Sequence, residues 1–471
     1  MKQHSLLEGS IPKNLIRLSV PIVLANILQA AYQLTDIFWV GRLGSTAVAA
    51  VSLSFPVVFL LISIGAGFSV AGTVLVAQYA GQKDRYHVNL TSGQTLLVMT
   101  VFSAAMTVVG YFLSPFLIPL MGGGEAMNEM AVSFLQISFL GLFFMYAYLV
   151  FQSLFRGVGN VIVPLIIVAL TVLLNFLMDP LLIMGWKFIP AYGVNGAAAS
   201  TVFCQGIAAL LGIYLMFRGR SGIHVRWKDL KPVPKEIRRI LSLGLPASAE
   251  QSTRALSMLM IMFLVTSAGV VGTAAYGVGS RVLSFVIIPA LGFSLATSTM
   301  VGQNIGASQF DRAFRIARIA CLIIFLTLTF VGVFLFIFAH GLMAFFVPGA
   351  PLVQQEGANF IRIISFTFGL IGIQQVSAGA LRGGGQTLAA MILAMTALWV
   401  IRFPLAYVLS RHTSLGVEGV WWAFCVSNTL AAVLAWILLY QRKWLRKITE
   451  DVDPLEQQVI EETAAENPRS D

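Results

Sequence analysis

Apolar segments of membrane-spanning length dominate the sequence and recur from about residue 15 to about residue 440. Each runs for roughly 20 residues, the length that an α-helix needs to cross the hydrocarbon core of a bilayer. The 471-residue chain is 58% hydrophobic and only 11% charged, a composition that soluble globular domains do not show. Apolar and polar residues do not alternate as they do in membrane β-barrels. The sequence therefore predicts an all-α polytopic membrane protein.

Four motifs of the first half recur in the second half, at offsets of 223 to 226 residues. The matched pairs are Pro21 with Pro246, Gln78–Gly81 with Gln303–Gly306, Arg156–Gly159 with Arg382–Gly385, and Gly193–Gly196 with Gly416–Gly419. Such self-similarity indicates a duplication. Each half then has six spans, and an even number of crossings gives both halves the same orientation. We expect a pseudo-two-fold axis along the membrane normal, with a binding site between or within the two lobes.

Twelve transmembrane helices are expected on this basis. Their ranges are 15–40, 50–80, 92–118, 131–154, 162–185 and 193–217 in the first half, and 240–265, 275–305, 316–346, 357–380, 387–410 and 416–440 in the second. The domains that follow are an N-terminal six-helix lobe at 1–217, a basic cytoplasmic linker at 218–239, a C-terminal six-helix lobe at 240–440 and a cytoplasmic tail at 441–471. Because the tail is rich in Glu and other polar residues from about residue 448, we expect it to be disordered.

The net charge of +10 reflects membrane topology rather than nucleic-acid binding. Most of the 30 Lys and Arg residues fall on one set of alternate loops and on the termini, whereas Arg42, Lys187 and Arg411 fall on the opposite loops. The positive-inside rule then puts both termini and the 218–239 linker in the cytoplasm. We expect a multi-pass protein of a bacterial or archaeal cell (inner) membrane. Its expected partner is the lipid bilayer, and we expect no binding of nucleic acid.

Asp36 lies inside the first apolar segment, where a carboxylate costs about 2.5–3.5 kcal/mol on insertion scales. An acid at such a position is a candidate functional residue. It shares a helical face with Gln29, Tyr32 and Gln33, which precede it by seven, four and three residues. We expect these three polar side chains to line the substrate cavity.

A second polar pair, Asn175 and Asp179, is spaced four residues apart and so lies on one face of the fifth predicted helix. The first and fifth helices both run outward, and at 1.5 Å per residue Asp36 and Asp179 lie roughly 25–30 Å from the inner face. Thr201, in the inward-running sixth helix, falls near that depth. These four residues predict a cation or proton site in the outer half of the N-terminal lobe.

The chemistry of this predicted site favours H⁺ or Na⁺. Two close carboxylates cannot both stay ionised cheaply unless a proton or a bound cation neutralises the pair. A transition metal does not fit, because the five histidines fall in tails, loops or span ends and no thiolate partner is near. No metal ion is expected beyond Na⁺ at Asp36 and Asp179, and no other cofactor.

The duplication supplies an internal comparison for the acids. Asp36 aligns with Ile261, Asn175 with Trp399 and Asp179 with Phe403, so the second half lacks the acidic pair. A structural polar network is the alternative reading. If the carboxylates served helix packing, however, symmetry would favour similar groups in both halves.

Glu250 and Arg254 form a second charged pair, four residues apart in the seventh predicted helix. One interpretation is an i,i+4 ion pair that lines the cavity between the lobes or stabilises the helix. The other is a direct role in substrate binding or ion coupling. The sequence leaves both open.

Several of these motifs together resemble the multidrug and toxic compound extrusion (MATE) family, over about residues 10–445. They are Pro21, Asp36–Gly41, Gln78–Gly81, Arg156–Asn160 and Val301–Gly306. The resemblance implies a secondary antiporter that exports organic cations, drugs or other amphipathic compounds in exchange for H⁺ or Na⁺. Asp36, Asn175 and Asp179 match the cation-site pattern of the DinF-like prokaryotic branch. The NorM-like branch has an acid farther along the seventh helix, where this chain has Arg254, which favours the N-terminal site.

Other functions fit the sequence less well. A flippase or exporter of lipid-linked or lipid-like substrates would share the repeat architecture, but its cavity is usually dominated by basic residues, which the paired acids oppose. An intramembrane enzyme lacks a nucleophile with its base or a metal-ligand cluster, so we expect no enzymatic activity. A passive channel lacks repeated charged rings. The expectation is a transporter of small molecules that acts as a monomer.

Overall fold

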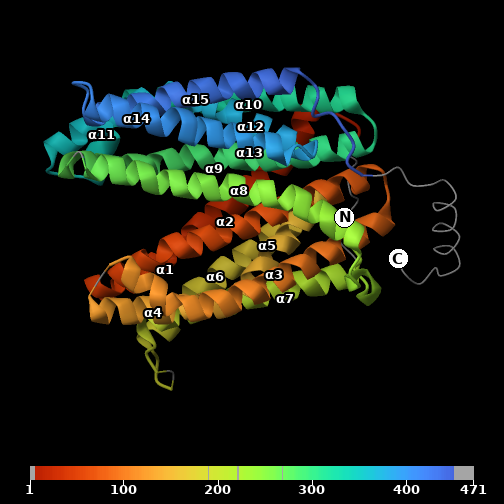
Figure 1. Ribbon diagram of the computed structural model, residues 1–471, viewed down its shortest axis with the longest axis horizontal. Coiled ribbons are helices and arrows are strands. Elements are labelled where there is room, and N and C mark those ends of the chain that lie inside the picture. Colours follow the sequence, from red (N-terminus) through yellow and green to blue (C-terminus); the bar gives the residue numbers. More distant parts are fainter. Residues whose placement is uncertain (1–5, 123, 189, 220–221, 268, 450–471) are drawn as a thin grey trace, which may run out of the picture. The chain divides into compact units, whose positions relative to one another are not determined.

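The computed structural model describes residues 6–122, 124–188, 190–219, 222–267 and 269–449 (Figure 1). Throughout this part the chain is built from helices without a β-strand, which confirms the all-α fold class. The first half contains α1 (Ile11–Gly41), α2 (Ser45–Gly81), α3 (Arg85–Leu120), α4 (Glu125–Leu140), α5 (Leu142–Gly157), α6 (Ile162–Met184), α7 (Gly193–Arg218) and the short η1 (Trp227–Leu230). The second contains α8 (Pro234–Thr266), α9 (Val270–Gly306), α10 (Phe310–Phe346), α11 (Pro351–Ser365), α12 (Phe368–Gly383), α13 (Thr387–Met395), η2 (Thr396–Arg402), α14 (Phe403–Arg411) and α15 (Val417–Tyr440). The predicted disorder of the tail concerns residues 450–471, which lie outside the described part.

The described helices account for the twelve expected spans. Nine are long and apolar enough to cross a membrane, and one of these nine is the run Thr387–Arg411, in which η2 is π-helical. Two further spans are bent pairs: α4 and α5 meet at 50°, and α11 and α12 meet at 53°. The twelfth is α8, which carries charged residues along its length.

The two bends fall at corresponding places in the two halves. Gly141 separates α4 from α5, and its missing side chain leaves room for Val202 of α7. Thr367 precedes α12, and its hydroxyl donates to the Ile364 carbonyl at 2.8 Å. Such a side-chain hydrogen bond competes with the regular helical pattern. The sequence pattern predicted each pair as one helix, at 131–154 and 357–380, because each range is long enough to span the membrane.

Backbone geometry at the turns supports the duplication. Four pairs of residues at the repeat spacing share a positive φ: Gly44 and Gly269 (109° and 111°), Lys83 and Ser308 (62° and 61°), Gly159 and Gly385 (83° and 76°), and Gly193 and Gly416 (55° and 54°). Gly193 and Gly416 are the first residues of the repeated motifs Gly193–Gly196 and Gly416–Gly419. The last glycine of each motif packs against a backbone carbonyl: Gly196 against that of Leu182, and Gly419 against that of Leu409. The motif recurs because both the turn and the close helix contact require glycine.

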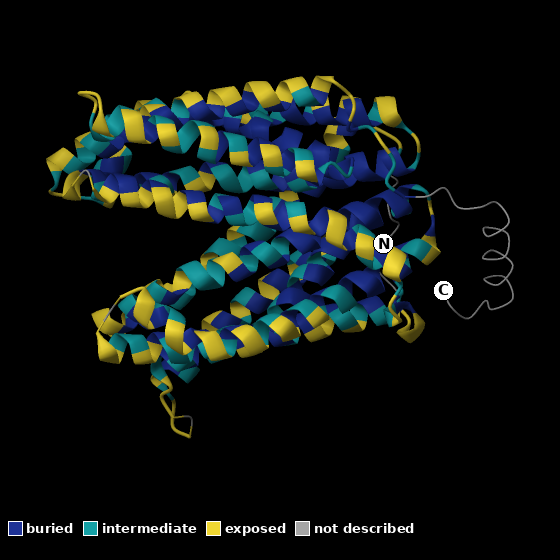
Figure 2. Cartoon of the chain, in the orientation of Figure 1, coloured by how far each residue is buried: buried dark blue, intermediate teal, exposed yellow. Residues whose placement is uncertain are grey.

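The described chain divides into two compact units. The first unit contains Leu24–Ser248, and the second contains Ala249–Ile448 with the N-terminal stretch up to Val23. Within each unit buried residues gather on the faces where helices pack, and exposed residues cover the remaining faces (Figure 2). Phe112 of the first unit is 70% exposed and Phe330 of the second is 75% exposed. Such side chains suit contact with lipid tails, which are as apolar as they are.

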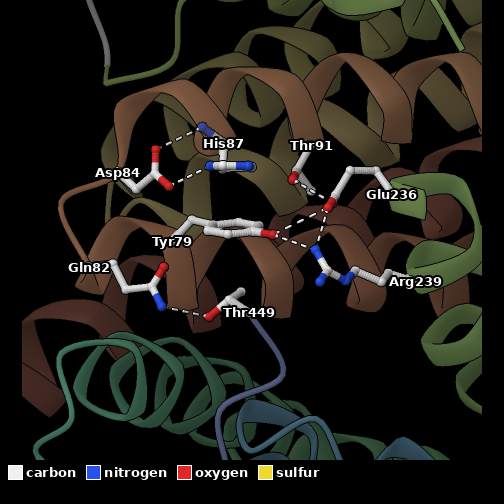
Figure 3. A network of polar contacts seen from close by, with 8 residues as sticks. All are labelled: Tyr79, Gln82, Asp84, His87, Thr91, Glu236, Arg239 and Thr449. Carbon is white, nitrogen blue, oxygen red and sulfur yellow. Dashed lines mark hydrogen bonds and ion pairs between the residues drawn. The ribbon is translucent and has the colours of Figure 1, made fainter. Parts of the chain in front are cut away.

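A polar network in the first unit joins α2, α3 and the start of α8 (Figure 3). Glu236, only 3% exposed, accepts hydrogen bonds from Arg239 at 2.6 Å, from Thr91 at 3.2 Å and from the Tyr79 hydroxyl at 3.3 Å. Nearby, Asp84 caps α3 by accepting from the His87 amide at 3.0 Å. The network compensates the burial of the Glu236 carboxylate and anchors the start of α8 to α2 and α3.

Candidate functional site

Side chains from α1, α6 and α7 meet around the amide of Asn175. Its Nδ2 lies 3.1 Å from Oδ1 of Asp36, 2.8 Å from Oδ1 of Asp179 and 3.5 Å from Oγ of Ser200. An amide group has two N–H donors, so a single side chain bridges the two carboxylates. Asn175 thereby holds two acids, 143 residues apart in sequence, in one place.

The rest of the site surrounds Asp36 and Asp179. The Thr201 hydroxyl donates to the second oxygen of Asp36 at 3.4 Å. The two carboxyl groups share the Asn175 amide as a common hydrogen-bond donor. Asn175 and Asp179 are fully buried, whereas Asp36 is half-buried. The acid on α1 is therefore the more accessible member of the pair.

Two oxygen atoms at the site are buried without a hydrogen-bond donor among the described residues: Oδ2 of Asp179 and Oδ1 of Asn175. Buried acceptors without a partner are costly, and native proteins rarely leave them so. Carboxylate, amide and hydroxyl oxygens are the ligands of hard cations, and a proton on a carboxyl group supplies the same missing donor. The residues present therefore fit either H⁺ or Na⁺.

A buried apolar cluster packs one helical turn beyond the site. It consists of Val40, Ala47, Ile183, Val194 and Ala197, from the adjoining ends of α1, α2, α6 and α7. Val40 follows Asp36 by four residues, Ile183 follows Asp179 by four, and Ala197 precedes Thr201 by four. Residues at this spacing share a helix face, so each site residue is stacked against an apolar neighbour. The cluster excludes water from that end of the acid pair.

The local sequence of α6 also shapes the site. Pro180 follows Asp179 inside the helix and has no N–H to donate. The carbonyl of Phe176, its usual partner one turn earlier, is left without that bond. This weakens the helix next to the buried carboxylate without ending it, because α6 continues to Met184.

Comparisons with known proteins agree with this architecture. The MatE family model matches residues 21–181 and 246–408, which is more than half of the chain. The chain belongs to the MATE family. Its two matched segments coincide with the duplicated halves of the sequence.

Similar proteins match more than 90% of this MATE chain. A probable multidrug resistance protein, YoeA of Bacillus subtilis, is 30% identical over 91% of this chain and 93% of its own length. A crystal structure of MATE in complex with MaL6 is 25% identical, with a TM-score of 0.88 over 94% of this chain and 98% of that one. A MOP superfamily transporter from Pyrococcus furiosus, described as having a binding pocket of reverse polarity that suggests a different function, gives a TM-score of 0.87 at 25% identity, covering 95% and 99%. The protein is thus a multi-pass member of a multidrug efflux family.

The structure brings four of the predicted residues of this MATE protein together: Asp36, Asn175, Asp179 and Thr201. The three polar residues preceding Asp36 lie differently. The Tyr32 side chain is buried beside Thr201, and Gln29 accepts a hydrogen bond from the Tyr148 hydroxyl at 3.3 Å. Gln33 is exposed. Of the three, only Tyr32 adjoins the acid pair.

Glu250 and Arg254 belong to the second unit and form an ion pair at 2.9 Å. Glu250 is 1% exposed, whereas the Arg254 side chain is 28% exposed. The geometry matches the i,i+4 pair that the spacing indicated. The Oε2 atom of Glu250 remains buried without a hydrogen-bond donor among the described residues.

The sequence interpretation missed Ser200 and Cys204 of α7. Ser200 approaches the Asn175 amide, and Cys204 is buried in the same helix. A signal was present, since Ser200 adjoins Thr201 and Cys204 follows Ser200 by one turn. A small hydroxyl or thiol in an apolar helix is common, so neither residue stands out alone.

Proposed function

We propose that this MATE protein is a secondary antiporter that exports cationic or amphipathic compounds in exchange for H⁺ or Na⁺ bound at Asp36 and Asp179. The observation that carries the proposal is the acid pair itself: a buried Asp179 and a half-buried Asp36 are bridged by Asn175, and Oδ2 of Asp179 and Oδ1 of Asn175 have no hydrogen-bond donor among the described residues. Membrane carboxylates of this kind mark ion pathways. The proposal includes a monomer in a bacterial or archaeal cell membrane with both termini in the cytoplasm.

The arrangement suggests how ion and substrate exchange. When the pair is ionised, its negative charge in a low-dielectric environment attracts a cationic substrate. A proton or Na⁺ neutralises the pair, which removes both that attraction and the repulsion between Asp36 and Asp179. The ion and the substrate therefore oppose one another through the same two carboxylates.

Two prolines provide points at which the acid-bearing helices can bend when the pair is neutralised. Pro21 lies in α1 and Pro180 lies in α6, the two helices that carry the acids. Each proline already lacks one helical hydrogen bond, so bending there breaks few further bonds. A neutral pair packs more closely than a charged one. We infer that α1 and α6 change their relative packing when the ion binds.

Equilibrium binding tests the proposal, because antiport requires that the two ligands lower each other's affinity. The purified protein in detergent is titrated with a cationic dye from about pH 5 to pH 8, with and without Na⁺. We expect affinity to fall when protons or Na⁺ are added, by about 5–150-fold, the range of typical coupling energies. Dye binding should in turn release a proton or Na⁺.

The matched variants are Asp36→Asn and Ile261→Leu. Asp36→Asn keeps nearly the same volume and removes the titratable group, so its dye affinity should no longer depend on pH or Na⁺. Ile261→Leu, at the corresponding position of the second half, should behave as the wild type. A wild-type affinity that stays constant under every condition rules out this coupling scheme.

A further inference from the structure

Arg402 of the second unit is a charged side chain near the middle of a span. It lies 15 residues after Thr387 and nine residues before Arg411, the ends of that span, which at 1.5 Å per residue is about 22 Å and about 13 Å along the helix. It is the last residue of the π-helical segment η2. Short π-helical segments occur frequently at functional sites.

The Arg402 side chain contacts three neutral side chains of α15. Its Nε donates to Oγ of Ser427 at 2.9 Å, and an Nη donates to Oδ1 of Asn428 at 2.6 Å. The guanidinium carbon lies 4.3 Å from the ring centroid of Phe424. We call Arg402, Phe424, Ser427 and Asn428 the Arg402 cluster. Among the described residues, none provides it with a carboxylate counter-ion.

The acids of the spans in this unit have other partners. Glu250 pairs with Arg254 at 2.9 Å. Glu356 accepts from the indole of Trp421 at 2.7 Å, and Glu418 accepts from Asn359 at 3.2 Å. A cation held in this environment without a counter-ion favours an anion.

The geometry of the Arg402 cluster is suited to an oxyanion. A guanidinium has five N–H donors, of which Ser427 and Asn428 engage two. Three donors remain in a planar fork that matches a carboxylate or phosphate. The fork is held in position, because Asn428 donates onward to Thr367 at 3.2 Å and the Phe424 ring stacks on one face. Arg402 as a whole residue is half-buried.

The duplication relates the Arg402 cluster to the acid pair. With the offset of 224 that relates Pro180 to Pro404, Arg402 corresponds to Met178, next to Asp179. With the offset of 223 that relates Gly193 to Gly416, Phe424 corresponds to Thr201. The two halves thus place opposite charges at adjacent positions of the repeat, acids in the first and an arginine in the second.

We propose that the Arg402 cluster is an oxyanion site that binds the carboxylate or phosphate group of a transported compound. The inference rests on the proposed export function and narrows its substrate class to amphipathic compounds that carry an acidic group, zwitterions included. A purely structural arginine would instead only join η2 to α15.

A pair of dyes distinguishes these roles: a rhodamine with a free carboxylate and the same rhodamine as its ethyl ester. Binding of each to the purified full-length protein in detergent is measured by fluorescence anisotropy. We expect the wild type to bind the carboxylate form about tenfold more tightly, as one charge-assisted contact provides. Arg402→Gln should bring the two affinities within about twofold while leaving the ester unchanged, and Arg402→Lys should lie between. Arg411→Gln, an exposed arginine on the same helix, should retain the full preference.

A second measurement covers the case in which Arg402→Gln unfolds or the dyes do not bind. The thermal unfolding midpoint of the wild type is followed with inorganic phosphate, with phosphatidylglycerol, and with chloride at matched ionic strength. Phosphate should raise the midpoint in the wild type and in Arg411→Gln, by a smaller amount in Arg402→Lys, and not in Arg402→Gln. Stabilisation by phosphatidylglycerol alone, without a dye preference, would assign the site to a lipid headgroup and overturn its role for transported compounds.

Absence of both the dye preference and the phosphate effect would overturn the oxyanion site altogether. The export proposal fails by a different observation, namely ester binding that ignores pH and Na⁺. The two ideas are therefore tested separately in one set of titrations.

Discussion

Asn175→Ala removes the donor that bridges the two carboxylates, and its effect follows from the distances at the site. The amide donates to Asp179 at 2.8 Å and to Asp36 at 3.1 Å, and hydrogen bonds to charged groups contribute about 1.5–3 kcal/mol each. These bonds favour the ionised pair. Without them the pair binds a proton at a higher pH. One pH unit corresponds to about 1.4 kcal/mol, so the loss of one such bond predicts a shift of about one to two pH units.

The assay is the pH dependence of dye affinity in detergent without Na⁺. In Asn175→Ala the midpoint of that profile should move to higher pH, and dye affinity at pH 7 should fall relative to the wild type. Asn175→Asp is unsuitable as a control because it adds a charge, so Thr171→Ala, one turn away on the same buried face, serves instead. An unchanged midpoint, or one that moves to lower pH, would refute the role of Asn175 in stabilising the ionised pair.

Three further predictions concern the acid pair, the duplication and the helix contact beside the site. Asp179→Asn should abolish pH-dependent dye binding and leave the thermal unfolding midpoint near that of the wild type, and retention of full pH dependence would contradict its role. Phe403→Leu, at the position corresponding to Asp179, should leave ion coupling intact in the same titration, and loss of coupling would show that the second half shares the site. Gly196→Ala should destabilise the protein by about 1–3 kcal/mol, because the new methyl group meets the Leu182 carbonyl. Gly206→Ala in the same helix, with its nearest neighbour at 3.6 Å, should not lower the unfolding midpoint, and equal effects would contradict the steric account.

The four clustered site residues could be predicted because helical spacing and depth are properties of the sequence. Four-residue spacing places Asn175 and Asp179 on one face, and equal distances from the inner face bring Asp36 and Thr201 to the same level. The twelve spans were predictable for a similar reason, since each must contain enough apolar residues to cross the bilayer.

Other features depend on how helices rotate and pack, which spacing does not determine. Ser200 contacts Asn175 only because α7 turns that face toward α6, and Gln33 shares a nominal face with Asp36 but lies exposed. The bends at Gly141 and Thr367 fall inside ranges that were predicted as single helices, because the hydropathy pattern does not indicate a bend. The partners of Arg402 lie on α15, 25 and 26 residues away, and no local pattern connects them.

Ion-driven dye efflux from proteoliposomes tests the central claim most directly. Dye is loaded inside the vesicles, and H⁺ or Na⁺ is then added outside to the wild type, Asp36→Asn and Ile261→Leu at equal protein density. We predict efflux driven by at least one of the two ions in the wild type and in Ile261→Leu, and only passive leak in Asp36→Asn. Ion-driven efflux by Asp36→Asn at the wild-type rate would contradict the assignment of coupling to the Asp36 and Asp179 pair.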